Sequence, residues 1–166
     1  GLQQTPPNQV IIGIALFLTF FIMAPIATEI NNEALQPYIN SEISQEVAIE
    51  RAMAPIRSFM FKQTRDKDLS LFLNLKGISK VSSLDEIPTH VLIPAFIISE
   101  LKTAFQIGFI IFIPFLVIDM VVASTLMAMG MMMLPPVIIS LPFKLLLFVL
   151  VDGWNLIAKS LILGFN

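Results

Sequence analysis

Two apolar segments flank one polar segment along the chain. The first apolar run covers residues 10–23 without a charge, and with its flanks it reaches about the 20 residues that a helix needs to cross a bilayer. Residues 29–90 hold seven of the ten Lys and Arg residues and nine of the twelve Asp and Glu residues. Apolar character then returns and continues to the end of the sequence. The pattern predicts an all-α integral membrane protein. Its three regions would be residues 1–30, 31–90 and 91–166.

The polar region is expected to be helical. Glu42, Glu46 and Glu50 recur every four residues, which places them on one face of a helix. Pro55 is best placed in the first turn of a helix, so the pattern predicts that a second helix begins there. That helix would end at Gly77, because glycine readily adopts the left-handed conformation that closes a helix.

Prolines divide the predicted apolar helices. Pro25 is expected to close the first helix, and Pro94 and Pro114 to divide the next apolar stretch into about 91–113 and 115–129. A last segment would run from about 137 to 165. The region should therefore consist of long, broken helices and helical hairpins.

The sharpest break lies at residues 130–136. A helix that enters this stretch must end near Gly130, because glycine weakens a helix and because Pro135 and Pro136 exclude helix from the preceding residue. Three consecutive methionines stand in between: Met131, Met132 and Met133. The stretch is predicted to be a flexible, sulfur-rich loop between two membrane-compatible helices.

The methionine run has two interpretations. Methionine is unbranched and adaptable, so it often fills irregular gaps in a core. Three in a row cannot all face one core, however, which favours a soft apolar ring that closes around varied cargo or seals when empty. Gly130, Pro135 and Pro136 would then act as hinges of the loop. Metal binding by the thioethers is disfavoured, since no Cys or His accompanies them.

Composition narrows the class of protein. The chain is 56% hydrophobic and 13% charged, with a mean hydropathy of +0.84, which is typical of membrane proteins. The net charge of −2 argues against a nucleic-acid surface. One histidine, no cysteine and no nucleotide-binding or nucleophile motif give no indication of an enzyme, a metal site or a cofactor.

Isolated charges interrupt the apolar C-terminal region. They are three acidic and three basic residues: Glu100, Lys102, Asp119, Lys144, Asp152 and Lys159. A charge in an apolar run is costly, so it usually pairs or faces water. The equal numbers allow neutralisation within the chain or across a subunit boundary. We favour assembly-directing ion pairs, and a proton or ion pathway is the alternative.

Several motifs resemble the flagellar branch of the FliP/SctR family of type III secretion export-gate proteins. The most specific lie after residue 94, at residues 99–109, 112–115, 130–136, 141–144 and 149–154. Residues 3–9, 21–25 and 64–69 are similar to that family as well. The resemblance covers essentially the whole chain, and it implies a preceding signal-like region and a further hydrophobic helix.

The resemblance implies a function that composition does not show. Members of this family are not enzymes. Five copies form a helical pore assembly with FliQ and FliR, with FlhB and FlhA nearby, and the gate passes unfolded flagellar proteins across the inner membrane at the flagellar basal body. Met131, Met132 and Met133 would correspond to the gasket that narrows the pore. Residues 31–90 would correspond to the periplasmic part. The matching buried charges would make subunit contacts: Glu100, Lys102, Asp119 and Lys144.

Two other functions remain open on the residues alone. A secondary transporter or ion channel would use the charges of the apolar region as its pathway, and it would work as a single purified protein. A structural anchor for the polar region would tolerate loss of the methionine loop. That last reading leaves the break at residues 130–136 unexplained.

Overall fold

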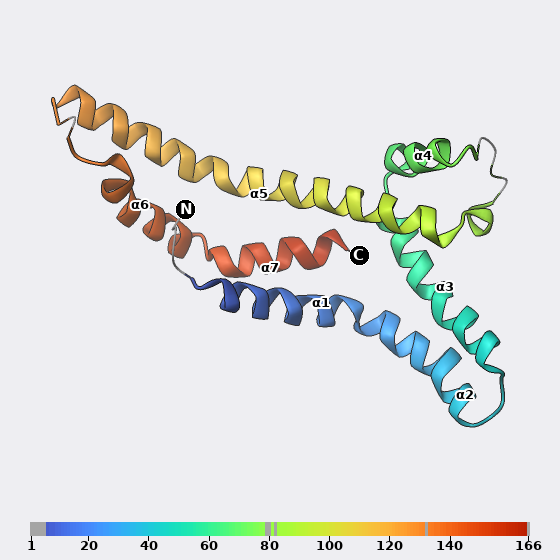
Figure 1. Ribbon diagram of the computed structural model, residues 1–166. Helices are drawn as coiled ribbons and strands as arrows, with labels where there is room; N and C mark the ends of the chain where they lie inside the picture. The colour runs from blue at the N-terminus through green and yellow to red at the C-terminus, as the bar shows by residue number, and fades with distance from the viewer. Residues whose placement is uncertain (1–5, 79–80, 82, 132, 166) are drawn as a thin grey trace. The chain divides into compact units, whose positions relative to one another are not determined.

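The computed structural model describes residues 6–78, 81, 83–131 and 133–165, and each regular element in them is a helix (Figure 1). The all-α prediction is therefore confirmed. The elements are α1 (Asn8–Ile30), the π-helix η1 (Asn31–Leu35), α2 (Gln36–Ile39), α3 (Gln45–Gln63), α4 (Asp66–Leu75), the 3₁₀-helix η2 (Leu84–Glu86), α5 (Thr89–Ala128), α6 (Pro136–Leu150) and α7 (Gly153–Gly164).

The chain divides into two compact units. Unit 1 comprises residues 1–19 and 106–166, and unit 2 comprises residues 20–105. The divisions fall inside α1 and α5, so each of these long helices contributes to both units. Two helical stretches are long and apolar enough to cross a membrane, Asn8–Ile39 and Thr89–Ala128. The bent pair of α6 and α7 would be a third if it forms one span.

Prolines do not divide the helices as predicted. Helix α1 continues past Pro25, α3 past Pro55, and α5 past both Pro94 and Pro114. A proline removes one hydrogen bond of the helical ladder and crowds one carbonyl group. In long helices the remaining bonds keep the chain helical, as is common in membrane helices. The predicted helix starting at Pro55 is thus wrong, and α3 starts at Gln45 instead, where the Ser44 hydroxyl accepts from the Val47 amide at 3.4 Å.

Unit 2 has a small apolar core between α3, α4 and the start of α5. Met60, Ile87, Val91 and Leu92 are buried together. The predicted stop at Gly77 is confirmed, because α4 ends at Leu75 and Gly77 has a φ of +72°. The single helix predicted from Pro55 to Gly77 is wrong, since α3 ends at Gln63 and α4 begins at Asp66. The amide of Gly77 donates to Asn74 O, and that of Ile78 to Leu73 O, the pairing of a glycine-terminated helix.

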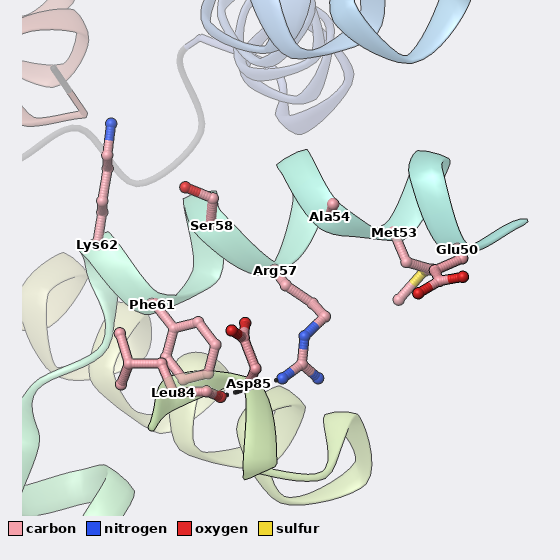
Figure 2. A pocket seen from close by; sticks show the side chains of 9 residues that line it. All are labelled: Glu50, Met53, Ala54, Arg57, Ser58, Phe61, Lys62, Leu84 and Asp85. Atoms are coloured by element: carbon pink, nitrogen blue, oxygen red, sulfur yellow. Dashed lines mark hydrogen bonds between the residues drawn. The ribbon is translucent and has the colours of Figure 1, made fainter. Parts of the chain in front are cut away.

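Two arginines tie unit 2 together. Arg57 of α3 donates to the carbonyl oxygens of Leu84 (3.3 Å) and Ile87 (2.7 Å) and to the Thr89 hydroxyl (2.5 Å). Figure 2 shows its guanidinium reaching from α3 to the segment at Leu84. It thereby supplies donors to backbone oxygens around a 3₁₀ turn and links α3 to the start of α5.

The second arginine joins the α3–α4 turn to α5. The Arg65 amide donates to the buried Ser99 hydroxyl at 3.0 Å, and that hydroxyl donates to Asp68 Oδ2 at 2.8 Å. The Arg65 guanidinium reaches Thr103 Oγ1, one turn further along α5, at 3.1 Å. This network sets the position of α5 within unit 2.

Unit 1 differs from the sequence prediction at residues 137–165. This stretch is two helices rather than one, because α6 ends at Leu150 and α7 begins at Gly153 with a bend of 59°. Asp152 has a left-handed backbone with φ +49°. A Cβ at Gly153 would collide with the ring of Phe148. The bend therefore brings Phe148 against residues 153–154, and its ring meets that of Trp154 edge to face at 5.5 Å.

Candidate functional site

The loop between α5 and α6 starts where the sequence predicts. Helix α5 ends at Ala128, and Gly130 has a φ of +74°. The Gly130 amide donates to Met127 O at 3.1 Å, and the Met131 amide donates to Leu126 O at 2.9 Å. This is a Schellman motif, in which a left-handed glycine lets the last carbonyl groups of a helix find donors. These hydrogen bonds therefore fix the backbone conformation at the start of the loop.

The loop presents apolar side chains to its surroundings. Met131 is 46% exposed and Met133 is 98% exposed. Met132, the middle residue of the predicted gasket, lies outside the described residues. At the far end, Pro135 precedes the first residue of α6, Pro136, which is the position where proline suits a helix best. Figure 1 shows α5 and α6 leaving the two ends of this short loop.

An ion pair between a buried lysine and a partly exposed aspartate crosses the hairpin that carries the loop. Lys144 Nζ of α6 lies 2.7 Å from the carboxylate of Asp119 on α5. Ser140, one turn before Lys144, donates from its hydroxyl to the same carboxylate at 2.5 Å. Only 4% of Lys144 and none of Ser140 is exposed. Paired and hydrogen-bonded, these charges can remain in an apolar hairpin, and they connect α5 to α6.

Two of the four predicted assembly charges are thus paired with each other inside one chain. The family resemblance predicts subunit contacts for Asp119 and Lys144, and those contacts stay a prediction; within this chain the two residues pair with each other. Ser140 was missed in the sequence. The signal that could have found it is its spacing, because residues four apart lie on the same face of a helix and Ser140 precedes Lys144 by four.

The other two predicted charges lie in unit 2. Glu100 is partly buried, and Arg65 of the α3–α4 turn acts on it electrostatically. Lys102 is exposed. The four charges are thus divided between the two units, with Asp119 and Lys144 in unit 1. Among the described residues there is no group of three or more His, Cys, Asp or Glu side chains that could hold a metal ion.

An apolar groove runs along the same hairpin. The groove has a volume of about 460 Å³. It lies between α5 and α6 and extends to Met129, close to the start of the loop. Val121, Leu126 and Met129 of α5 line it together with Ile139 and Phe143 of α6. Thus an exposed methionine loop, a buried polar connection and an apolar groove all belong to one helical hairpin.

These features define an all-helical protein with helices of membrane-spanning length and a loop-bearing apolar hairpin. The sequence model of the FliP family matches residues 1–161. The chain is 66% identical over 163 residues to the flagellar biosynthetic protein FliP of Bacillus subtilis (strain 168), covering 98% of this chain and 74% of that protein. It is 58% identical over 165 residues to FliP of Pectobacterium carotovorum subsp. carotovorum, covering 99% and 64%. The chain belongs to the FliP family.

The similarity extends to FliP proteins of further bacteria. FliP of Aquifex aeolicus (strain VF5) is 54% identical over 168 residues, covering 100% of this chain and 70% of that protein. FliP of Buchnera aphidicola subsp. Acyrthosiphon pisum (strain APS) is 55% identical over 166 residues, but the chain spans only 44% of its length. The resemblance inferred from the motifs is thus confirmed at the level of the family.

Proposed function

We propose that this chain is a core subunit of the flagellar type III protein-export gate. Together with other membrane subunits it would form a channel that passes unfolded flagellar proteins across the bacterial inner membrane. Its relatives are named flagellar biosynthetic proteins, and its longest helices have the length and polarity of membrane spans. In this role the chain would form part of a channel and would not catalyse a reaction.

The observation that carries the proposal is the loop between α5 and α6. The Gly130 motif fixes the start of the loop, Pro135 and Pro136 fix its end, and the side chains of Met131 and Met133 are exposed. Thioether side chains adapt to many shapes. A ring of such loops could therefore close an empty channel and still yield to a passing chain. Met131, Met132 and Met133 would form this gasket.

The chain would act as one of several copies. We expect about five copies around a channel, with FliQ and FliR bound to them and FlhB and FlhA nearby, as in the family's gate. Large apolar side chains on α1, α5, α6 and α7 are exposed in the isolated chain, which supports coverage by lipid or by other subunits. Unit 2 carries most of the charged residues, which suits a portion on the periplasmic side.

The first experiment is native mass spectrometry of the detergent-extracted complex after co-expression with the other export-gate subunits. A large species with several copies of this chain and fewer copies of the small partners is expected. A monomer without partners would contradict the proposal and favour a secondary transporter or ion channel. The Asp119–Lys144 pair would then become the pathway to test, with Asp119→Asn abolishing transport by the purified chain.

The gasket is tested by replacing Met131, Met132 and Met133 together with alanine. Because the described methionines of the loop make few contacts in the chain, assembly should persist while cells become leaky to ions and small solutes. Replacing Met120 and Met127, which are exposed on α5 outside the loop, provides the control. A triple variant that stays tight and exports normally would remove the loop from the sealing role.

A further inference from the structure

We propose that the methionine loop is also a modification site, at which oxidation of the thioethers to methionine sulfoxide opens the seal. The proposal rests on the proposed function, because it needs the loops of several copies to close one channel. It keeps the loop methionines together in one sealing role and adds a sensitivity to peroxide.

The loop holds methionine side chains that a small oxidant can reach. Met133 is 98% exposed and Met131 is 46% exposed. Met60, by contrast, lies in the core of unit 2 and is 6% exposed. An oxidant must touch the sulfur to react with it, so exposure sets the order in which the methionines react. The chain has no cysteine, so methionines are the sulfur groups that it offers to an oxidant.

The reaction with hydrogen peroxide changes the polarity of the side chain. A sulfur lone pair attacks one peroxide oxygen, so a sulfur–oxygen bond forms and the oxygen–oxygen bond breaks. The released hydroxide takes the proton of the transferred oxygen and leaves as water. The sulfur is thereby oxidised by two electrons, and the peroxide is reduced by two. An apolar thioether has become a polar, chiral sulfoxide.

A sulfoxide oxygen in the loop finds no side-chain donor in the neighbouring sequence. Residues 126–139 are apolar side chains, glycine and proline throughout. Thr125, just before this stretch, donates its hydroxyl to Val121 O at 2.8 Å. Ser140, just after it, donates its hydroxyl to the Asp119 carboxylate. The hydroxyls on either side of the loop are therefore already used.

The described backbone of the loop offers few donors as well. The amides of Gly130, Met131 and Leu134 already donate to carbonyl groups, and Pro135 and Pro136 have no amide hydrogen. The sulfoxide oxygen must therefore take its hydrogen bonds from water, because a polar group without a partner is costly in apolar surroundings. Water held in a ring of apolar side chains ends the dewetting by which a hydrophobic constriction stays closed.

The first test measures which methionines react in the multi-copy complex, purified after co-expression with the other gate subunits. Brief treatment with hydrogen peroxide, followed by proteolysis and mass spectrometry, gives the rate of sulfoxide formation at each methionine. We expect Met133 to react several-fold faster than the buried Met60. Equal rates at the two positions, or protection of Met133 in the complex, would contradict the proposal.

The second test measures the seal itself. The complex is placed in vesicles of phosphatidylethanolamine and phosphatidylglycerol that hold a small fluorescent dye, and vesicles without protein control for damage to the lipid. We expect peroxide to raise dye release several-fold. Methionine sulfoxide reductases for both epimers should then lower it again, because they restore the thioether. Unchanged release from a complex whose loop is oxidised would overturn the proposal.

Leucine variants assign the effect to the loop. Leucine is apolar and similar in volume to methionine, but it has no sulfur to oxidise. With Met131, Met132 and Met133 all replaced by leucine, each sample is compared with itself before treatment, and peroxide should no longer raise its dye release. The matched control replaces Met120 and Met127, exposed on α5 outside the loop, by leucine and should stay sensitive.

The outcomes separate this proposal from the proposed function. A loop variant with leucine that responds to peroxide as strongly as the unchanged chain would overturn the oxidation site alone. If no multi-copy complex forms, or if the triple alanine variant stays tight, the proposed function fails as well.

Discussion

Units 1 and 2 consist of similar helices, but they are stabilised by different interactions. Unit 2 has a buried core around Met60 and Leu92, and arginine side chains bond across it to oxygens of other segments. Unit 1 leaves large side chains such as Phe109 and Leu150 exposed. Its described residues contain one buried polar connection, at Asp119, Ser140 and Lys144.

The difference indicates how far each unit covers its own apolar surface, and how far it needs lipid or other subunits to do so. Unit 2 has an apolar core of its own, although side chains such as Phe20 and Phe105 are exposed there too, so part of its stability should be present before assembly. Unit 1 leaves its apolar surface to lipid or to other subunits, and the ion pair keeps α5 and α6 in register meanwhile. The following predictions test this contrast, from the largest expected effect to the smallest.

The largest effect is expected from Lys144→Ala. Removal of the amine leaves the partly exposed Asp119 carboxylate without its cation, which should cost unit 1 about 2–3 kcal/mol. Thermal unfolding in detergent micelles measures the loss, and the yield of the multi-copy complex should fall with it. Lys159→Ala, an exposed lysine of α7, is the control and should change stability by less than about 0.5 kcal/mol.

A double variant separates charge from packing. If the cost comes from a stranded carboxylate, Lys144→Met combined with Asp119→Leu should recover most of the stability lost by Lys144→Ala. A double variant as unstable as the single one would show that the ion pair is not the cause.

Arg57→Met should destabilise unit 2 by about 1–3 kcal/mol, because the buried carbonyl oxygen of Ile87 loses its donor. Hydrogen exchange of the amides around residues 84–92 is the measurement, and it should accelerate there while α6 and α7 remain unchanged. Lys62→Met is the matched control, because Lys62 is exposed and lines, with Arg57, a separate pocket between α3 and the segment at Leu84 (Figure 2). Equal exchange in both variants would contradict the role of Arg57.

Ser99→Ala should cost about 1–2 kcal/mol, since the Arg65 amide and Asp68 both lose the hydroxyl between them. The midpoint of urea unfolding followed in unit 2 reports the loss. Ser70→Ala removes only an exposed hydroxyl that donates to the Asp66 carbonyl, so it serves as the control. If the two variants unfold at the same urea concentration, the network does not stabilise α5.

Gly130→Ala should have the smallest destabilising effect, about 1 kcal/mol, because an L side chain is strained at φ +74°. The open space around Gly130 excludes a clash as the cause. Gly108→Ala, inside α5, meets no neighbour either and has ordinary helical geometry, so it should stabilise α5 by about 0.5–1 kcal/mol. Opposite signs in thermal unfolding are expected, and a shared sign would argue against backbone strain.

The sequence by itself determined the features that depend on local chemistry. The apolar segments and the charged region between them predict the helices and their environments. Gly77 and Gly130 end their helices as predicted, since a left-handed residue is a local requirement that glycine alone meets without strain. The family motifs could also be recognised from the sequence, because each motif is a run of consecutive residues.

Only the tertiary structure decided how distant residues combine. Asp119 and Lys144 are 25 positions apart, and nothing in their spacing says that they pair with each other rather than with a second chain. The bend after α6 depends on the contact between Phe148 and Gly153, and α3 and α5 remain helical through prolines that local rules treat as breaks. In each case the outcome depends on which groups come together in space, and packing, not neighbouring sequence, selects them.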